Sequence, residues 1–109
     1  MMRLSVAIIV FLNICFAPLC QGAQPDSAAR GIALFGQGEY DKAYHILLKA
    51  FEENPEDLEL NFFLGRAAFE SGRYEMAIMA FERILIARPD ENRVKLELAR
   101  AFFAAGSVN

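Results

Sequence analysis

The chain has 109 residues, 55% of them hydrophobic, with 11 basic and 14 acidic side chains. This length allows one small domain at most. Binding of nucleic acid needs a basic surface to neutralise phosphates, so the acidic balance predicts no nucleic-acid partner. Both cysteines, Cys15 and Cys20, fall in the first twenty residues, so the rest of the chain must be held by its core and not by disulfides.

Residues 1–23 have the pattern of a secretory signal peptide. Arg3 gives a basic start, residues 4–17 form an apolar run, and Pro18 interrupts it before a small residue, Ala23, where we expect cleavage. As a helix at ~1.5 Å per residue, the 14 apolar residues reach about 21 Å. A bilayer core is roughly 30 Å thick, so the run is short for a membrane span. The pattern therefore predicts export, with the bacterial periplasm as the expected location.

Two alternatives for the leader stay open. The leader can remain uncleaved and anchor the chain, which is the only membrane contact that we expect. Lipidation of Cys20 is the second alternative, although the residue before it is Leu19 where bacterial lipoproteins have a small residue. Removal of the leader leaves residues 24–109 with 10 basic and 14 acidic side chains, a net charge of −4.

Apolar residues recur at helical spacing through the remaining chain. The helices predicted in this way cover residues 27–37, 41–53, 58–69, 74–87 and 93–105. Glycine follows the first helix of each pair, at Gly38 and Gly72, and proline, which cannot continue a helix, follows the second. A further glycine, Gly106, marks the predicted end of the last helix. No stretch alternates as a half-buried strand does, so we expect an all-α fold.

The helical part of the sequence repeats itself with a constant period of 34 residues, for example from Gly31 to Gly65 and from Tyr40 to Tyr74. The positions that agree are small, aromatic and turn residues, which backbone geometry restricts most. They are Gly31, Gly38, Tyr40, Ala43, Leu47 and Pro55 in the first copy, and Gly65, Gly72, Tyr74, Ala77, Phe81 and Pro89 in the second. The copies cover about 24–57, 58–91 and, in part, 92–109. Small residues should let the two helices of a pair approach closely, while Leu47 and Phe81 should fill the gap between pairs.

These recurring positions resemble the pattern of the tetratricopeptide repeat family. The resemblance covers residues 24–109 and implies a tandem helix-turn-helix solenoid of about two and a half repeats. It departs from the family pattern at the early aromatic position of the first helix, which is Ser27 in one copy and Asn61 in the next. The family implies a scaffold for protein–protein or peptide interaction.

In arrays of this family the first helices of successive repeats line the concave side. Carrying that register over gives a candidate peptide-binding surface made of Ile32, Phe35, Phe62, Arg66, Phe69, Leu96, Arg100 and Phe103. The guanidiniums of Arg66 and Arg100 are one repeat apart, so they should stand side by side and suit a peptide with a carboxylate or acidic side chain. In the alternative interpretation the phenylalanines are core between repeats and the arginines pair with Glu59, Glu70 or Glu97.

The third copy supplies a first helix, residues 93–105, without its second helix. Apolar area left uncovered forfeits roughly 25 cal/mol per Å², so either the chain is the front of a longer protein or a partner covers this helix. Self-association through residues 93–105 is one form of the second interpretation. The segment "RPDENRVKLELARAFF" is also similar to the periplasmic repeats of surface lipoprotein assembly modifier-type outer-membrane proteins. That alternative makes the chain the truncated N-terminal part of a secretion protein whose C-terminal β-barrel is missing.

The residues offer little for catalysis. The single histidine, His45, lies between Tyr44 and Ile46 on a helix and is expected to be a surface residue. Carboxylates cluster at the repeat boundaries, where acidic residues favour helix starts. A small enzyme that uses Glu52, Glu56 and Glu59 is therefore the least favoured alternative. We expect no enzymatic activity, no cofactor and no metal site, and a protein or peptide as the partner.

Overall fold

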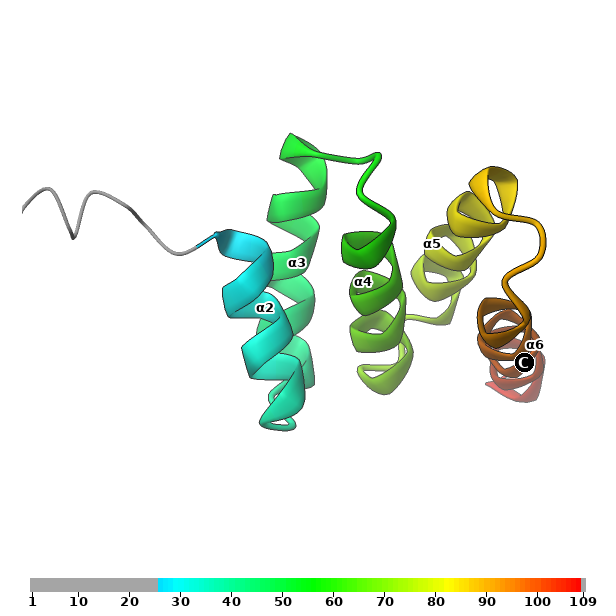
Figure 1. Cartoon of the computed structure of the whole chain (residues 1–109). Coiled ribbons are helices and arrows are strands. Elements are labelled where there is room, and N and C mark those ends of the chain that lie inside the picture. Colours follow the sequence, from blue (N-terminus) through cyan, green and yellow to red (C-terminus); the bar gives the residue numbers. More distant parts are fainter. Residues whose placement is uncertain (1–25, 109) are drawn as a thin grey trace, which may run out of the picture.

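The structure, a computed structural model, describes residues 26–108 (Figure 1). The predicted signal peptide lies outside the described residues. The described part forms five helices and no strand: α2 (Ser27–Gly36), α3 (Tyr40–Glu53), α4 (Leu58–Glu70), α5 (Tyr74–Ala87) and α6 (Asn92–Val108). The prediction of an all-α fold is confirmed. Each predicted helix boundary lies within one residue of the observed one, except the end of the last helix.

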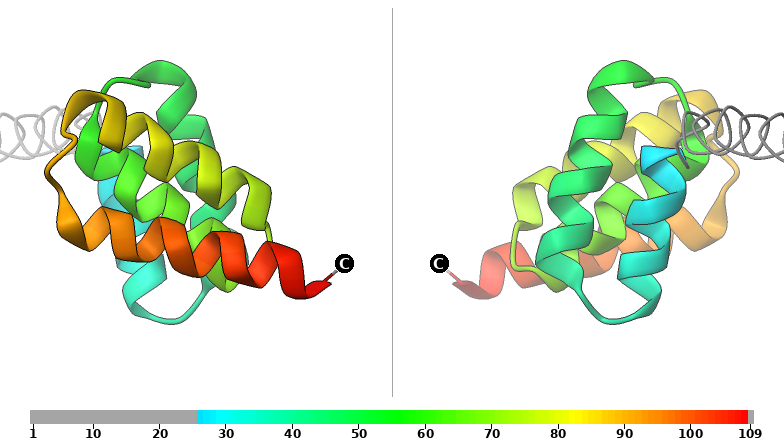
Figure 2. Two further views of the ribbon diagram at one scale, coloured as in Figure 1. Left: turned by 90° about the vertical axis from the view of Figure 1, so that its right-hand side faces the viewer. Right: turned by 90° about the vertical axis from the view of Figure 1, so that its left-hand side faces the viewer.

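The helices form two hairpins, α2–α3 and α4–α5, followed by α6 (Figure 1). Each helix packs mainly on its neighbours in the chain, and α2 also touches α4 directly. Views along the stack show the hairpins one behind another (Figure 2). This arrangement is the helical repeat that the periodic sequence predicts. None of the five described helices combines the length and the apolarity that crossing a bilayer requires.

Glycine with a positive φ ends the first helix of each hairpin. Gly38 and Gly72 both have φ of 81°, a conformation that side chains with a Cβ adopt at a cost. At the second turn Gly72 N–H donates to Phe69 O at 3.0 Å, and Arg73 N–H donates to Ala68 O at 2.7 Å. This pair of bonds is a Schellman motif, which satisfies carbonyls that the helix end leaves free. The turn fixes where α5 begins.

Replacing Gly72 with alanine should lower the free energy of unfolding by about 1 kcal/mol, because the left-handed conformation must be kept with a Cβ present. Open space surrounds the position, so strain and not a clash is the cause. Chemical denaturation monitored by circular dichroism measures the effect. Gly36→Ala is the matched control, since Gly36 has open space but no positive φ, and it should not destabilise the protein. Equal losses in the two variants would contradict the role of the backbone conformation.

The prediction that Gly106 ends the last helix is wrong. The helix α6 continues through this residue to Val108, and Gly106 lacks the positive φ of the two turn glycines. Glycine weakens a helix by about 1 kcal/mol relative to alanine but does not forbid it. The turns at Gly38 and Gly72 are enforced by the second helix that packs back on the first, and at Gly106 no such packing acts in the described residues.

Small residues let the helices of each hairpin approach closely, as predicted. A Cβ on Gly31 would lie 2.5 Å from Leu47 Cγ, and one on Gly65 would lie 2.6 Å from Phe81 Cε1. Leu47 and Phe81 are fully buried. The sequence predicted that these two side chains fill the gap between hairpins, whereas the structure places their ends against the glycine of their own hairpin. The glycine and the bulky residue therefore fit each other as a pair within one repeat.

The polar residue at the aromatic position of the second repeat has a structural role. Asn61 is fully buried in α4, and its Nδ2 donates to Pro55 O at 2.9 Å and to Asp57 O at 2.8 Å. Asp57 caps the same helix by accepting a bond from Leu60 N–H at 3.1 Å. These bonds tie the loop between the two hairpins to the start of α4. The departure from the family pattern at this position is thus compensated by hydrogen bonds in place of aromatic packing.

Candidate interaction surface

The first helices of the three copies, α2, α4 and α6, carry the residues predicted to bind a peptide. We call this surface the first-helix face, and its residues are Ile32, Phe35, Phe62, Arg66, Phe69, Leu96, Arg100 and Phe103. The guanidinium of Arg66 lies over the ring of Phe35, with Cζ 5.3 Å from the ring centre. That of Arg100 lies over Phe69 at 5.0 Å. Three helices that are distant in sequence therefore contribute to one continuous strip.

A single carboxylate joins the two arginines of this face. Glu97 of α6 is 8% exposed, and both of its oxygens lie 3.2 Å from Arg100 Nη1. Its Oε2 is also 3.8 Å from Arg66 Nε. The pairing with Glu97 is one of those named in the alternative interpretation, and it leaves a surplus of one positive charge in the group. The two hydrogen bonds from Arg100 lie within α6, and the ion pair with Arg66 links Glu97 to α4.

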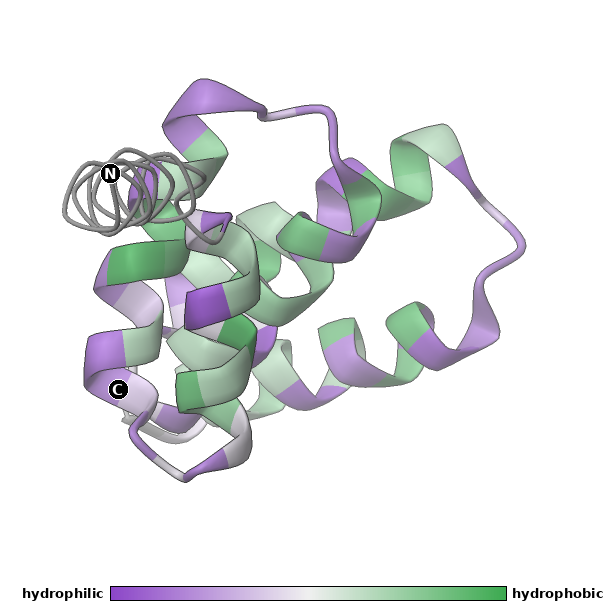
Figure 3. Ribbon diagram, turned by 60° about the vertical axis from the view of Figure 1, so that its left-hand side comes forward, coloured by the Kyte–Doolittle hydropathy of each residue, from purple (hydrophilic) through white to green (hydrophobic). Residues whose placement is uncertain are grey.

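The apolar residues of the face differ in exposure along the stack. Ile32, Phe35, Phe62 and Phe69 are half-buried. On α6, Leu96 is 62% exposed and Phe103 is 78% exposed. Hydrophobic and hydrophilic stretches accordingly alternate along this helix (Figure 3). The face therefore offers accessible apolar side chains next to the guanidinium of Arg100.

Stacking of arginine on aromatic rings recurs throughout the stack. Arg66 also lies over Phe62 of its own helix, at 5.9 Å. In the other five contacts the arginine lies in, or directly before, the second helix after the one that carries the ring, slightly less than one repeat later in the chain. The pairs are Arg66–Phe35, Arg73–Tyr44, Arg83–Phe51, Arg93–Phe62 and Arg100–Phe69. Sequence reasoning missed this pattern, although the near-constant spacing was the signal that could have found it. Cation–π contacts contribute roughly 0.5–1 kcal/mol each at exposed sites, so they join neighbouring repeats together.

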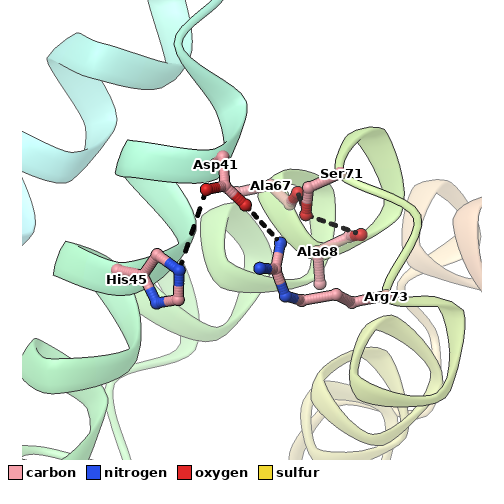
Figure 4. Close-up of polar contacts among 6 residues, drawn as sticks. All are labelled: Asp41, His45, Ala67, Ala68, Ser71 and Arg73. Atoms are coloured by element: carbon pink, nitrogen blue, oxygen red, sulfur yellow. Dashed lines mark hydrogen bonds and ion pairs between the residues drawn. The ribbon is translucent and has the colours of Figure 1, made fainter.

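A further polar cluster lies away from the first-helix face, where the second turn meets α3. Asp41 forms an ion pair with Arg73, whose Nη1 lies 2.8 Å from its Oδ1, and its Oδ2 lies 3.8 Å from His45 Nε2 (Figure 4). On the other side of the same turn, Ser71 Oγ donates to Ala67 O at 2.7 Å. The side chain of His45 is 62% exposed, as expected for a surface histidine. Within residues 26–108 no group of three or more histidine or acidic side chains is placed to hold a metal ion.

The sequence of this stack matches the family model described as tetratricopeptide repeat over residues 28–92. The match covers more than half of the chain. The chain belongs to the tetratricopeptide repeat family. The matched range contains the recurring glycines, tyrosines, alanines and prolines on which the resemblance was based. A search of curated proteins gave no match.

Solved structures of MamA resemble this tetratricopeptide repeat chain. A MamA mutant is 31% identical, with a TM-score of 0.70, and the match covers 76% of this chain and 64% of the other. MamA from AMB-1 is also 31% identical, with a TM-score of 0.69 and coverage of 73% and 47%. MamA from MSR-1 is 31% identical with a TM-score of 0.70, and the match covers 79% of this chain and 52% of the other. The chain thus spans about half to two thirds of the length of these structures.

Neutralising Glu97 should loosen the packing between the second tetratricopeptide repeat and α6. We expect Glu97→Gln to lower the free energy of unfolding by about 1 kcal/mol, because glutamine keeps an acceptor but loses the charge that both arginines share. Denaturant titration measures the loss. Glu70→Gln is the control, since Glu70 is exposed on α4 and makes no ion pair within residues 26–108. A smaller loss for Glu97→Gln than for the control would contradict the bridging role.

Proposed function

We propose that this tetratricopeptide repeat protein is an exported scaffold of the periplasm that binds a partner protein through a peptide segment laid along the first-helix face. The observation that carries the proposal is the pair Leu96 and Phe103, which leave large apolar surfaces exposed on either side of Arg100. Aromatic and arginine side chains dominate the binding energy of protein interfaces. The family to which the chain belongs supports a protein partner, and the leader pattern of residues 1–23 supports export.

The chemistry of the face favours recognition over catalysis. Its polar groups are guanidiniums that stack on rings and share Glu97. Guanidiniums held in this way can accept a further carboxylate but are always charged and cannot act as acid or base. Glu52, Glu56 and Glu59, the residues of the enzyme alternative, are exposed at the boundary between hairpins and not gathered in a buried site. We therefore propose a role without enzymatic activity.

Selection of peptides tests the binding surface. Peptides enriched from a random display library against the full-length protein should lose binding about tenfold or more in the double variant Leu96→Ser/Phe103→Ser. A tenfold loss corresponds to about 1.4 kcal/mol. Ile86→Ser is the matched control, because Ile86 is 82% exposed on α5, outside the face. Peptides that bind both variants as well as the wild type would place recognition elsewhere, and failure to enrich any peptide would overturn the peptide mode.

Expression in a Gram-negative host tests the proposed location. Intact mass of the protein released from the periplasm should correspond to a chain that begins at Gln24. A mass that includes residues 1–23 in the membrane fraction would favour the anchored form. Added mass on Cys20 would favour the lipoprotein form. Retention of the whole chain in the cytoplasm would overturn the proposal of export.

A further inference from the structure

A cavity lies where the start of α4, the end of α5 and the start of α6 meet. Its volume is about 520 Å³, which is within the range of roughly 300–1,000 Å³ typical of ligand sites. The residues that line it are Leu58, Glu59, Phe62, Phe63, Ile84, Arg88, Glu91, Arg93 and Val94. None of them except Phe62 was predicted to take part in binding. Phe62 also belongs to the first-helix face, so the cavity adjoins that face at this residue.

The apolar part of the cavity is built on closely packed side chains. Ile84 and Val94 are 3% and 2% exposed, so they belong to the core that joins α5 to α6. Phe63 packs edge-on against Phe62 with ring centres 5.6 Å apart, and against Phe35 of the preceding repeat at 5.8 Å. Side chains held in this way lose little entropy when a ligand binds. The lining therefore suits a bulky apolar group, which it can bury without rearrangement.

Two guanidiniums are available at the same cavity. Arg93 lies over the ring of Phe62, with Cζ 4.4 Å from the ring centre, and this contact holds its donors in place. Within residues 26–108 neither Arg93 nor Arg88 forms an ion pair with a carboxylate, whereas Arg66 and Arg100 share Glu97. A planar guanidinium fixed by stacking binds carboxylates at a low cost in entropy. Arg93 is therefore better placed than Arg66 or Arg100 to receive an acidic group.

The lining also holds two acidic residues, Glu59 and Glu91, neither of which forms an ion pair with Arg88 or Arg93 in the described residues. Glu59 lies in the first turn of α4, and Glu91 immediately precedes α6, so each interacts favourably with the positive end of a helix dipole. The carbonyl of Glu91 accepts a bond from Val94 N–H at 3.1 Å, which fixes its backbone at the helix start. Their charges do oppose an acidic ligand. Neutralising one of them should therefore raise the affinity for an acidic ligand and lower the affinity for a basic one, which tests the charge of the ligand.

We propose that this cavity is a subsite for one large apolar side chain of a bound peptide, with the acidic side chain of a neighbouring residue on Arg93 and Arg88. The inference rests on the proposed function, because it places part of the same peptide. The occupant is an internal segment and not a chain end, since the cavity adjoins the first-helix face at Phe62 and the proposed peptide passes on along that face. The large apolar side chain of the peptide would fill the apolar part of the lining, and the neighbouring carboxylate would pair with the arginines at its rim.

Titration with short probes, followed by amide shifts of the full-length protein, tests the subsite. The probe is the blocked dipeptide acetyl-glutamyl-phenylalanine amide, with the glutaminyl and lysyl analogues for comparison. Shifts should concentrate in residues 58–63 and 91–94, and the glutamyl probe should bind at least about threefold more tightly than the glutaminyl one. Equal or tighter binding of the lysyl probe would overturn the proposal, as would shifts away from the cavity. Tighter binding of acetyl-phenylalanine with a free carboxylate would overturn the internal segment in favour of a chain end.

Variants at the rim separate the subsite from the rest of the surface. Arg93→Gln should abolish the preference for the glutamyl probe, and Glu59→Gln should increase affinity for it because a repulsive charge is removed. Arg88→Gln supplies a second test of the cationic rim, and Arg30→Gln on the exposed surface of α2 is the control for charge alone. Unchanged preference in both Arg93→Gln and Arg88→Gln would overturn the subsite. If selected peptides still depended on Leu96 and Phe103, the proposed function would stand while the subsite failed.

Discussion

Replacing Phe81 with alanine should lower the free energy of unfolding by about 3–5 kcal/mol, the range for removing a large aromatic side chain from a core. Phe81 is fully buried, and its ring packs against Gly65 and Phe62 of α4, in the same hairpin. Gly65 cannot extend into the space that alanine would leave. The cavity should therefore collapse poorly, and the cost should lie toward the upper end of the range. Thermal and urea denaturation followed by circular dichroism measure the loss.

The control for this variant is Phe103→Ala, which removes the same side chain from the first-helix face. Phe103 is 78% exposed, and surface substitutions usually change stability by less than about 0.5 kcal/mol. The two variants should therefore differ by several kcal/mol in stability although the chemical change is identical. A loss for Phe103→Ala as large as that for Phe81→Ala would show that α6 is packed differently from the helix described above.

The fold could be predicted because the restricting residues recur in phase. Gly38 and Gly72 need a positive φ, and Pro55 and Pro89 cannot continue a helix, so four local constraints place four helix ends. At Gly106 the same residue type is followed by helix, because glycine permits a turn and only packing demands one. The sequence likewise marked Asn61 as a departure from an aromatic position. Its bonds to Pro55 and Asp57 depend on where the loop lies in space, which spacing does not give.

The candidate surface was predictable in register but not in pairing. The repeat period alone is enough to put Arg66 and Arg100 on the same face, whatever their rotamers are. Which carboxylate they use is decided by reach, and of the three named candidates only Glu97 forms an ion pair with either guanidinium. The cavity beside Phe62 arises where three helix ends meet, so no single stretch of sequence indicates it.

The stacked arginines relate stability to recognition. Arg66, Arg93 and Arg100 each cover an aromatic ring of an earlier helix. A peptide bound to the first-helix face would therefore contact these guanidiniums as well as the rings beneath them. A guanidinium that lies flat on a ring keeps its in-plane donors free for a carboxylate. The contacts that hold successive repeats together thus also orient the charges that a peptide would meet. Lysine at these positions would keep the charge but lose the planar donors.

Replacing Gly65 with alanine should lower the free energy of unfolding by about 2 kcal/mol, since overpacking of a filled core costs roughly 1–3 kcal/mol. The added Cβ would lie 2.6 Å from Phe81 Cε1 and 2.8 Å from Cζ. The ring cannot move aside because it is fully buried. Gly106→Ala is the control, and it should change the free energy of unfolding in the opposite direction. Gly106 lies inside α6 with open space around it, so alanine there should stabilise the helix by about 0.5–1 kcal/mol.

A double-mutant cycle separates the clash from other effects of alanine at position 65. Phe81→Leu removes the ring atoms that the new Cβ would meet, so Gly65→Ala should cost less in that background than in the wild type. The expected coupling between the two substitutions is about 1 kcal/mol or more, as for residues in direct contact. Denaturation of the four proteins under the same conditions gives the value. Strict additivity would mean that the glycine is needed for the backbone of α4 and not for the approach of α5.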